Sequence, residues 1–173
     1  HKKENQNRTY TITEDKKNRL WFGTKEGLIV VSADHQKYNH ITSTDSLNGL
    51  TSDVVRSILE AKDGTIWVGT DGGGLCKVVE STFGDIKFKS YLKNPDDSNS
   101  ISNNSVLSIH EGKDGKLWIG TFGGGLNVFN PKTEKFYAYT QKDGLSNNVI
   151  YGIAEDKKGN LWMSTNKGIS QFF

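Results

Sequence analysis

Four tryptophans mark an internal repeat that restricts the chain to one type of architecture. They lie 46, 51 and 44 residues apart, and each has an isoleucine nine residues before it and a threonine three residues after it. The tryptophans are Trp21, Trp67, Trp118 and Trp162, and the isoleucines are Ile12, Ile58, Ile109 and Ile153. A glutamate follows each isoleucine by two residues, at Glu14, Glu60, Glu111 and Glu155. Agreement at so many positions indicates that one structural unit is repeated along the chain.

Each copy is predicted to be a set of short strands. In the third copy, alternating and β-branched residues predict strands around 108–111, 117–121, 126–129 and 135–139. The turn between the first two strands carries a repeated glycine at Gly64, Gly115 and Gly159, with Asn18 in the first copy. These residues suit a positive φ, which glycine adopts without steric cost and asparagine tolerates. Residues 52–60 alone could form a capped helix, but the aligned copies favour a strand.

Four strands in a unit of 44 to 51 residues predict an all-β chain of β-propeller blades. We place four consecutive four-stranded antiparallel blades at about 7–52, 53–103, 104–147 and 148–173, and the last lacks its fourth strand. The residue before each repeat isoleucine is small, as expected for an innermost strand beside a crowded central axis. The tryptophans are expected to form the core between blades, with sugar stacking as the alternative.

The two ends of this array are expected to associate with further blades or with another chain. Four blades are few for a closed ring, so we interpret the chain as part of a larger propeller or as one that pairs with another chain. Terminal repeats need polar caps, and neither end of the sequence supplies one. Homodimerisation or aggregation through exposed blade faces is therefore expected.

Four segments carry a resemblance to a known family. The segments Asp114-Gly115-Lys116-Leu117-Trp118-Ile119-Gly120-Thr121 and Gly123-Gly124-Gly125-Leu126 look like the two-component regulator propeller repeat. The connection Asp143-Gly144-Leu145-Ser146-Asn147-Asn148-Val149-Ile150 and the segment Ile153-Ala154-Glu155-Asp156 complete the likeness. The resemblance implies the periplasmic sensor region of a Bacteroides-type hybrid two-component sensor histidine kinase. There, two seven-bladed propellers precede a membrane helix and kinase modules, and members typically recognise oligosaccharides to regulate polysaccharide utilisation.

Composition and spacing argue against several other functions. A net charge of +2 does not indicate a nucleic-acid-binding surface. The single cysteine, Cys76, permits neither an internal disulfide nor a cysteine-based metal cluster. The histidines lack ligand spacing, and no unrepeated pair of carboxylates stands out among the 20 acids. Asp63 and Asp114 are expected to cap turns, and the repeat glutamates to accept hydrogen bonds at the hairpins. We therefore expect no catalytic residue, metal site or cofactor.

The candidate ligand-binding residues are those that vary between copies on one face. The turns after the second strands place Lys25, Asp71, Phe122 and Asn166 there. The connections between blades add Asp53, Asn104 and Asn148 to the same side, with the long connection 93–104. Amide and carboxylate groups suit sugar hydroxyls, and an exposed Phe122 could stack on a sugar ring. Alternatively, the aligned Asp and Asn side chains could bond backbone between blades.

These inferences predict a non-enzymatic, periplasmic ligand-sensing or scaffold segment that responds to oligosaccharides. Its expected partners are the remaining blades and the kinase modules of a parent chain. One alternative is a propeller enzyme, such as a polysaccharide or antibiotic lyase or a glycosidase. Another is a propeller that serves only protein interaction.

Overall fold

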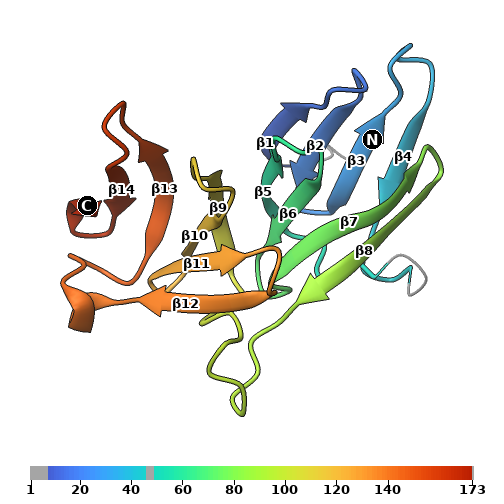
Figure 1. Cartoon of the computed structure of the whole chain (residues 1–173). Coiled ribbons are helices and arrows are strands. Elements are labelled where there is room, and N and C mark those ends of the chain that lie inside the picture. Colours follow the sequence, from blue (N-terminus) through green and yellow to red (C-terminus); the bar gives the residue numbers. More distant parts are fainter. Residues whose placement is uncertain (1–7, 46–48, 173) are drawn as a thin grey trace, which may run out of the picture.

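The computed structural model describes residues 8–45 and 49–172, which form four antiparallel sheets (Figure 1). The first blade consists of β1 (Thr9–Glu14), β2 (Leu20–Thr24), β3 (Gly27–Val31) and β4 (Tyr38–Ile41). The second consists of β5 (Val55–Glu60), β6 (Ile66–Thr70), β7 (Leu75–Thr82) and β8 (Asp85–Tyr91). The third consists of β9 (Val106–Glu111), β10 (Leu117–Thr121), β11 (Leu126–Asn130) and β12 (Lys135–Tyr139). The fourth consists of β13 (Ile150–Glu155), β14 (Leu161–Thr165) and β15 (Gly168–Phe172).

The predicted propeller architecture is confirmed. Strands follow chain order within every sheet, and the first strand of each blade packs on the first strand of the next: β1 on β5, β5 on β9 and β9 on β13. The segment that could have been a helix forms strand β5. Helical structure among the described residues is limited to the short 3-10 turn η1 (Gln141–Asp143), and no helix there is long and apolar enough to cross a membrane.

The first hairpin of each blade explains the repeated glycine. Gly64, Gly115 and Gly159 have φ values of 85°, 76° and 93°, and Asn18 has a φ of 58°. A Cβ atom would strain this left-handed conformation, which is why glycine recurs. Asp63 and Asp114 cap their turns as predicted, since their Oδ1 atoms accept hydrogen bonds from Thr65 N and Lys116 N at 2.9 and 3.1 Å.

In the first three blades, the small residue before the repeat isoleucine pairs with a glycine of the second strand. The inner strand of the next blade crowds this glycine. A Cβ atom on Gly120 would lie 2.7 Å from Ile150 O, and one on Gly69 would collide with Ser57 and Val106. Glycine in the second strand, opposite a small residue in the first, therefore lets the next inner strand approach closely. The cost is visible at Ser57 and Ser108, whose buried hydroxyl oxygens have no hydrogen-bond partner.

Three hydrophobic clusters fill the spaces between successive blades. In the second of them, the Trp67 ring packs edge-on against Phe129 of the next blade, with ring centroids 5.4 Å apart. Trp21 and Trp67 are almost fully buried, as expected for an inter-blade core, and Trp118 packs against Phe172 of the fourth blade. Trp162 is 41% exposed, because no described blade packs on that side of the fourth sheet.

The repeat glutamates join blades to each other. We expected them to accept hydrogen bonds at the hairpins, and two of them do so at the first hairpin of the preceding blade. Glu60 accepts from Lys16 N at 3.1 Å, and Glu111 accepts from Lys62 N at 2.7 Å, each across a blade boundary. Glu155 pairs with Lys113 Nζ at 3.4 Å. Glu60, Glu111 and Glu155 thus contact the first-hairpin turn of the preceding blade, and the described residues contain no cluster suited to a metal ion.

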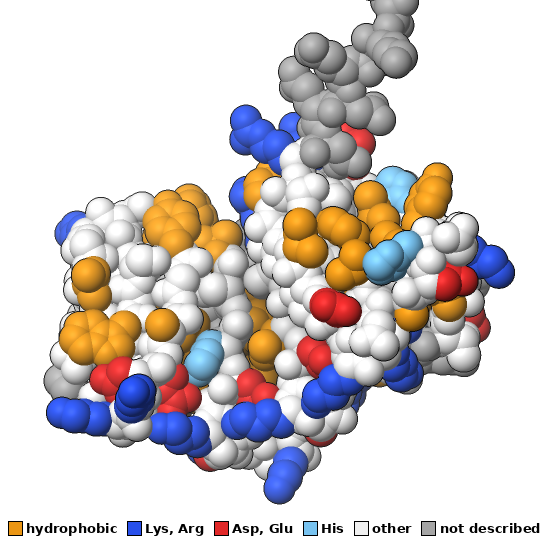
Figure 2. All heavy atoms as spheres, turned by 90° about the horizontal axis from the view of Figure 1, so that it is seen from above, with side chains coloured by type: hydrophobic (Ala, Val, Ile, Leu, Met, Phe, Trp, Pro, Cys, Tyr) orange, Lys and Arg blue, Asp and Glu red, His pale blue; other side chains and the backbone are white. Residues whose placement is uncertain are grey.

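Both ends of the array expose apolar side chains that are more buried at equivalent positions elsewhere. On the fourth blade, Ile169 is exposed, whereas Leu28, Leu75 and Leu126 are fully buried. On the first blade, Ile12 and Tyr38 are exposed. Figure 2 shows hydrophobic side chains at both sides of the molecule, with basic and acidic side chains intermixed along one edge.

We predict that Trp67→Ala destabilises the chain far more than Trp162→Ala. Removing the buried ring leaves a cavity between two blades, which costs about 3–5 kcal/mol. Trp162 covers one blade only, so its removal should cost less than half as much. Urea unfolding followed by circular dichroism measures both, and equal losses would contradict the inter-blade role of Trp67.

Candidate functional site

A hollow at the start of the inner strands brings together four residues from four blades. Its lining is Tyr10, Arg56, Leu107, Tyr151, Asp71 and Phe122, around a cavity of about 420 Å³. We call it the axial mouth. The first four side chains occupy equivalent positions, two residues before the repeat isoleucines. Because the inner strands pack side by side, these equivalent positions converge.

A repeated β-bulge sets the direction of these four side chains. In β5 the pairing with β6 passes from Val55 to Ser57 and leaves Arg56 without a partner. The same shift leaves Tyr10, Leu107 and Tyr151 unpaired in β1, β9 and β13. Bulges commonly redirect a side chain at a functional site. In every blade the unpaired residue lies outside the pairing of the first and second strands, so its identity is free to vary.

The polar part of the mouth is a fixed ion pair. The Arg56 guanidinium lies over the Tyr10 ring, 4.2 Å from its centroid, and its Nη2 donates to Asp71 Oδ2 at 2.9 Å. The other carboxylate oxygen of Asp71 accepts from Ser105 Oγ at 2.7 Å. Burial alone would raise the pKa of Asp71, but the hydrogen bonds from Ser105 and Arg56 outweigh it and lower that pKa. Asp71 is therefore an ionised acceptor.

The apolar part of the mouth is aromatic. Phe122 is 54% exposed although its backbone is fixed, since its N–H donates to Ser105 O at 2.9 Å and it forms an isolated bridge with Val149. Tyr151 is 49% exposed, and its hydroxyl donates to Asn166 Oδ1 at 2.8 Å. Two ring faces thus remain open to a ligand on a rigid support.

The structure divides the seven candidate residues into two groups. Asp71 and Phe122 line the mouth, and Asn166 adjoins it through Tyr151. Asp53, Asn104 and Asn148 instead brace the connections between blades: their Oδ1 atoms accept from Ser43 N, Lys93 N and Gln141 N at 2.6 to 2.7 Å. Lys25 is exposed at its turn and does not line the mouth. Connection 93–104 is held by this Asn104 bond and by Ser100 Oγ, which donates to Asn94 O.

Sequence reasoning missed the four bulge residues of the mouth. A signal was present, because the position between the initial apolar or threonine residue and the invariably small residue reads Tyr, Arg, Leu and Tyr. A variable position within a repeated strand is typical of a site that packing does not restrict. The bulge that makes the position significant is visible only in the strand pairing.

The comparisons with known proteins agree with this architecture. The sequence model of the two-component regulator propeller matches residues 3–26, 49–72, 100–123 and 144–167, together more than half of the chain. This chain belongs to the two-component regulator propeller family. Each matched segment of this regulator propeller contains an inner strand, the first hairpin and the second strand.

Three relatives place this regulator propeller among signalling proteins. It is 30% identical to the extracellular domain assigned to hybrid two-component system BT3049 of B. thetaiotaomicron, with a TM-score of 0.79, covering 95% of this chain and 21% of that one. The corresponding domain of BT4673 from the same organism is 26% identical, with a TM-score of 0.80, covering 95% and 23%. Histidine kinase P4 of Formosa agariphila is 39% identical over 90 residues, covering 51% of this chain and 6% of the kinase. The chain thus spans a small part of the length of each relative.

We predict that Arg56→Met raises the pKa of Asp71. The carboxylate loses its charged donor while its burial remains. In the native chain, Asp71 stabilises the fold above its ordinary pKa of 3.8, and this contribution is lost as the pH falls through its lowered folded value. Carboxyl carbon NMR across pH 2 to 6 measures the shift. An unchanged titration would contradict a direct role for Arg56.

Proposed function

We propose that this regulator propeller is a non-enzymatic, periplasmic ligand-sensing segment of a hybrid two-component signalling protein, and that oligosaccharides bind in its axial mouth. The observation that carries the proposal is the mouth itself, where exposed rings surround a fixed ion pair at the meeting point of four blades. The likeness to extracellular domains of two-component systems supports the location. Kinase modules elsewhere in the parent chain would receive the signal, with polysaccharide utilisation as the regulated process.

The chemistry of the mouth favours a neutral sugar. Ligand sites combine apolar surface with a few fixed polar groups, and Phe122 and Tyr151 provide the first while Arg56 and Asp71 provide the second. Because Arg56 is neutralised by Asp71, the pair offers donors and an acceptor to hydroxyl groups without a net charge. Binding at the junction of several blades could change how those blades pack, which is the means of signalling that we propose.

The same geometry supports a role without catalysis. Glycoside hydrolysis normally uses two carboxylates on either side of the bond, and Asp71 is the one carboxylate among the described residues of the mouth. Both of its oxygens already accept hydrogen bonds. A propeller enzyme remains the competing proposal, and turnover of a labelled glycan that Asp71→Asn abolishes would support it. A surface that serves only protein interaction would bind no oligosaccharide.

We further propose that the exposed ends of the array pack on additional blades of a parent propeller. The support comes from the three interfaces inside the chain, where the residues equivalent to Ile169 are buried by the next blade. The relatives in B. thetaiotaomicron are more than four times the length of the matched part. In the isolated chain, the same faces would promote homodimers.

We predict that Phe122→Ala weakens oligosaccharide binding at least about tenfold, since it removes one ring face and the area that this face covers. Calorimetric titration with a panel of neutral oligosaccharides measures the affinity. Tyr137→Ala is the matched control, because Tyr137 is an exposed aromatic residue on β12 outside the mouth.

Two results would overturn the ligand proposal. One is an absence of binding across the panel. The other is an equal loss of affinity in the Phe122 and Tyr137 variants, which would indicate non-specific contact with exposed rings.

We predict that Ile169→Glu reduces self-association of the isolated chain. The substitution places a charge on the open face of the fourth blade, where Ile169 is 72% exposed and has little packing to lose. Light scattering over a range of concentrations measures the mass. Val79→Glu is the control, because Val79 is an exposed apolar residue on β7. A native chain that stays monomeric at every concentration would contradict the prediction.

A further inference from the structure

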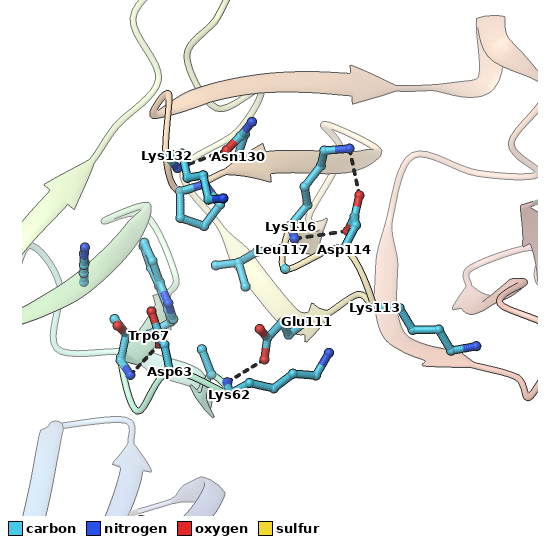
Figure 3. Close-up of a pocket in the computed structure, with 15 residues that line it drawn as sticks. Lys62, Asp63, Trp67, Glu111, Lys113, Asp114, Lys116, Leu117, Asn130 and Lys132 are labelled. Atoms are coloured by element: carbon cyan, nitrogen blue, oxygen red, sulfur yellow. Dashed lines mark hydrogen bonds and ion pairs between the residues drawn. The ribbon is translucent and has the colours of Figure 1, made fainter.

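A second cavity lies between the second and third blades, at the opposite end of the inner strands from the axial mouth (Figure 3). Its volume of about 540 Å³ falls within the range of about 300–1,000 Å³ that is typical of small-ligand sites. Five lysines line this basic groove, from the turns and strands of both blades: Lys62, Lys77, Lys113, Lys116 and Lys132. We propose that the basic groove binds a compact phosphate oligomer, in which two or three phosphate groups are joined in a chain.

One lysine of the groove departs from the repeat. The residues that pair with the repeat tryptophans across the second and third strands are Val30, Lys77, Val128 and Gln171. Of the three blades that another blade follows, two thus have valine at this position. Lys77 is half-buried and extends over the Trp67 ring, with its Nζ 5.6 Å from the ring centroid. Because valine meets the packing requirement in the first and third blades, packing does not account for the lysine.

The position of Lys77 also opposes the stability of its sheet. It lies directly opposite Lys89 on β8, and like charges in such a pair are destabilising. Glu134 of the third blade neutralises Lys89, since both of its carboxylate oxygens accept from Lys89 Nζ at 2.6 Å. The hydrogen bond from Lys89 is the largest influence that lowers the pKa of Glu134, and the more distant Lys77 charge lowers it further. A residue that breaks a local rule in this way is expected at a functional site.

The carboxylates of the groove are engaged within the chain. Asp63 caps its turn, and Glu111 accepts from Lys62 N. Asp114 pairs with Lys116 Nζ at 2.7 Å, inside one turn. Five lysines face these three carboxylates, so the lining has a net charge of +2. The groove therefore favours an anionic ligand.

Two ammonium groups on opposite walls are available to such a ligand. Lys77 belongs to the second blade, and Lys132 is exposed in the turn after β11 of the third. Among the described residues, neither ammonium group has a carboxylate within ion-pair distance. Lys62 is less available, because its ammonium group donates to Gly112 O at 3.1 Å. An anion between the walls can therefore pair with one lysine from each blade.

The chemistry of the lining favours phosphate. Every cation in it is a lysine, which binds phosphate as a point charge, whereas the planar fork of arginine is the better match for a carboxylate. The large apolar side chains between the walls are closed to a ligand, since Trp67 and Leu117 are 2% and 1% exposed. A sugar or a nucleobase would thus find no open ring to stack on. A phosphate chain needs none, and its oxygens can accept hydrogen bonds from both walls.

The test is calorimetric titration of the chain, without divalent cations, with pyrophosphate, tripolyphosphate, ATP and citrate. The two inorganic phosphates should bind, and their affinity should fall between about 50 and 200 mM salt. ATP carries the same triphosphate and should bind no more tightly than tripolyphosphate, because the groove offers its base no open ring. Citrate carries its charge on carboxylates and should bind at least about tenfold more weakly than tripolyphosphate.

Two substitutions remove the available ammonium groups. Lys77→Val introduces the residue of the first and third blades, so it should weaken tripolyphosphate binding about tenfold without lowering the urea midpoint of unfolding. Lys132→Ala should weaken binding by a similar factor. Lys135→Ala is the matched control, because this exposed lysine of β12 lies outside the groove. Phe122→Ala should leave tripolyphosphate binding unchanged, which separates this outcome from that of the axial mouth.

Several results would overturn the proposal. Failure of both inorganic phosphates to bind would do so, as would an equal loss of affinity in the Lys135 and Lys132 variants. ATP that binds tenfold more tightly than tripolyphosphate would indicate a nucleotide site, and citrate that binds as tightly would indicate unselective attraction of anions. A lower urea midpoint for Lys77→Val would show that packing requires the lysine.

Discussion

The close packing of one inner strand against the preceding blade is the contact on which the rest of the structure depends. Val55, Val106 and Ile150 are fully buried, and each begins an inner strand that lies against a glycine of the preceding blade. The strand lies so close that the glycine has no room for a Cβ atom. The hydroxyl oxygens of Ser57 and Ser108 are buried at these contacts without a hydrogen-bond partner. Trp21, Trp67 and Trp118 pack in the hydrophobic clusters between successive blades. A blade therefore obtains much of its core from its neighbour, as expected of a repeat protein.

Polar contacts fix the same boundaries at both ends of the inner strands. At one end, the repeat glutamates accept hydrogen bonds from the turn of the preceding blade. At the other end, the N–H groups of Gly27, Gly74 and Gly125 donate to the carbonyls of Asp53, Asn104 and Asn148 in the connections. The side chains of those same Asp and Asn residues brace the connections. The repeat thus combines apolar packing in the middle with backbone bonds at its edges.

The bulge separates function from packing within this scheme. It leaves one residue per inner strand outside the pairing, so that residue can change without loss of the blade contact. The four bulges place their variable residues around one mouth, where the packing of the blades sets the positions of an ion pair and two open rings.

The sequence by itself determined the number of blades, their strands and most of the inter-blade core. The repeated Trp, Ile, Gly and Glu positions were sufficient because every blade must meet the same packing requirement, and repetition makes that requirement visible. Residues that do not repeat lack this signal. Asp71 and Phe122 could be predicted from their turns, whereas the only sequence signal for Tyr10, Arg56 and Tyr151 is a variable position inside the repeat. Only the tertiary structure decided that these residues converge, because a one-residue bulge and the packing of four strands from distant parts of the chain set their direction.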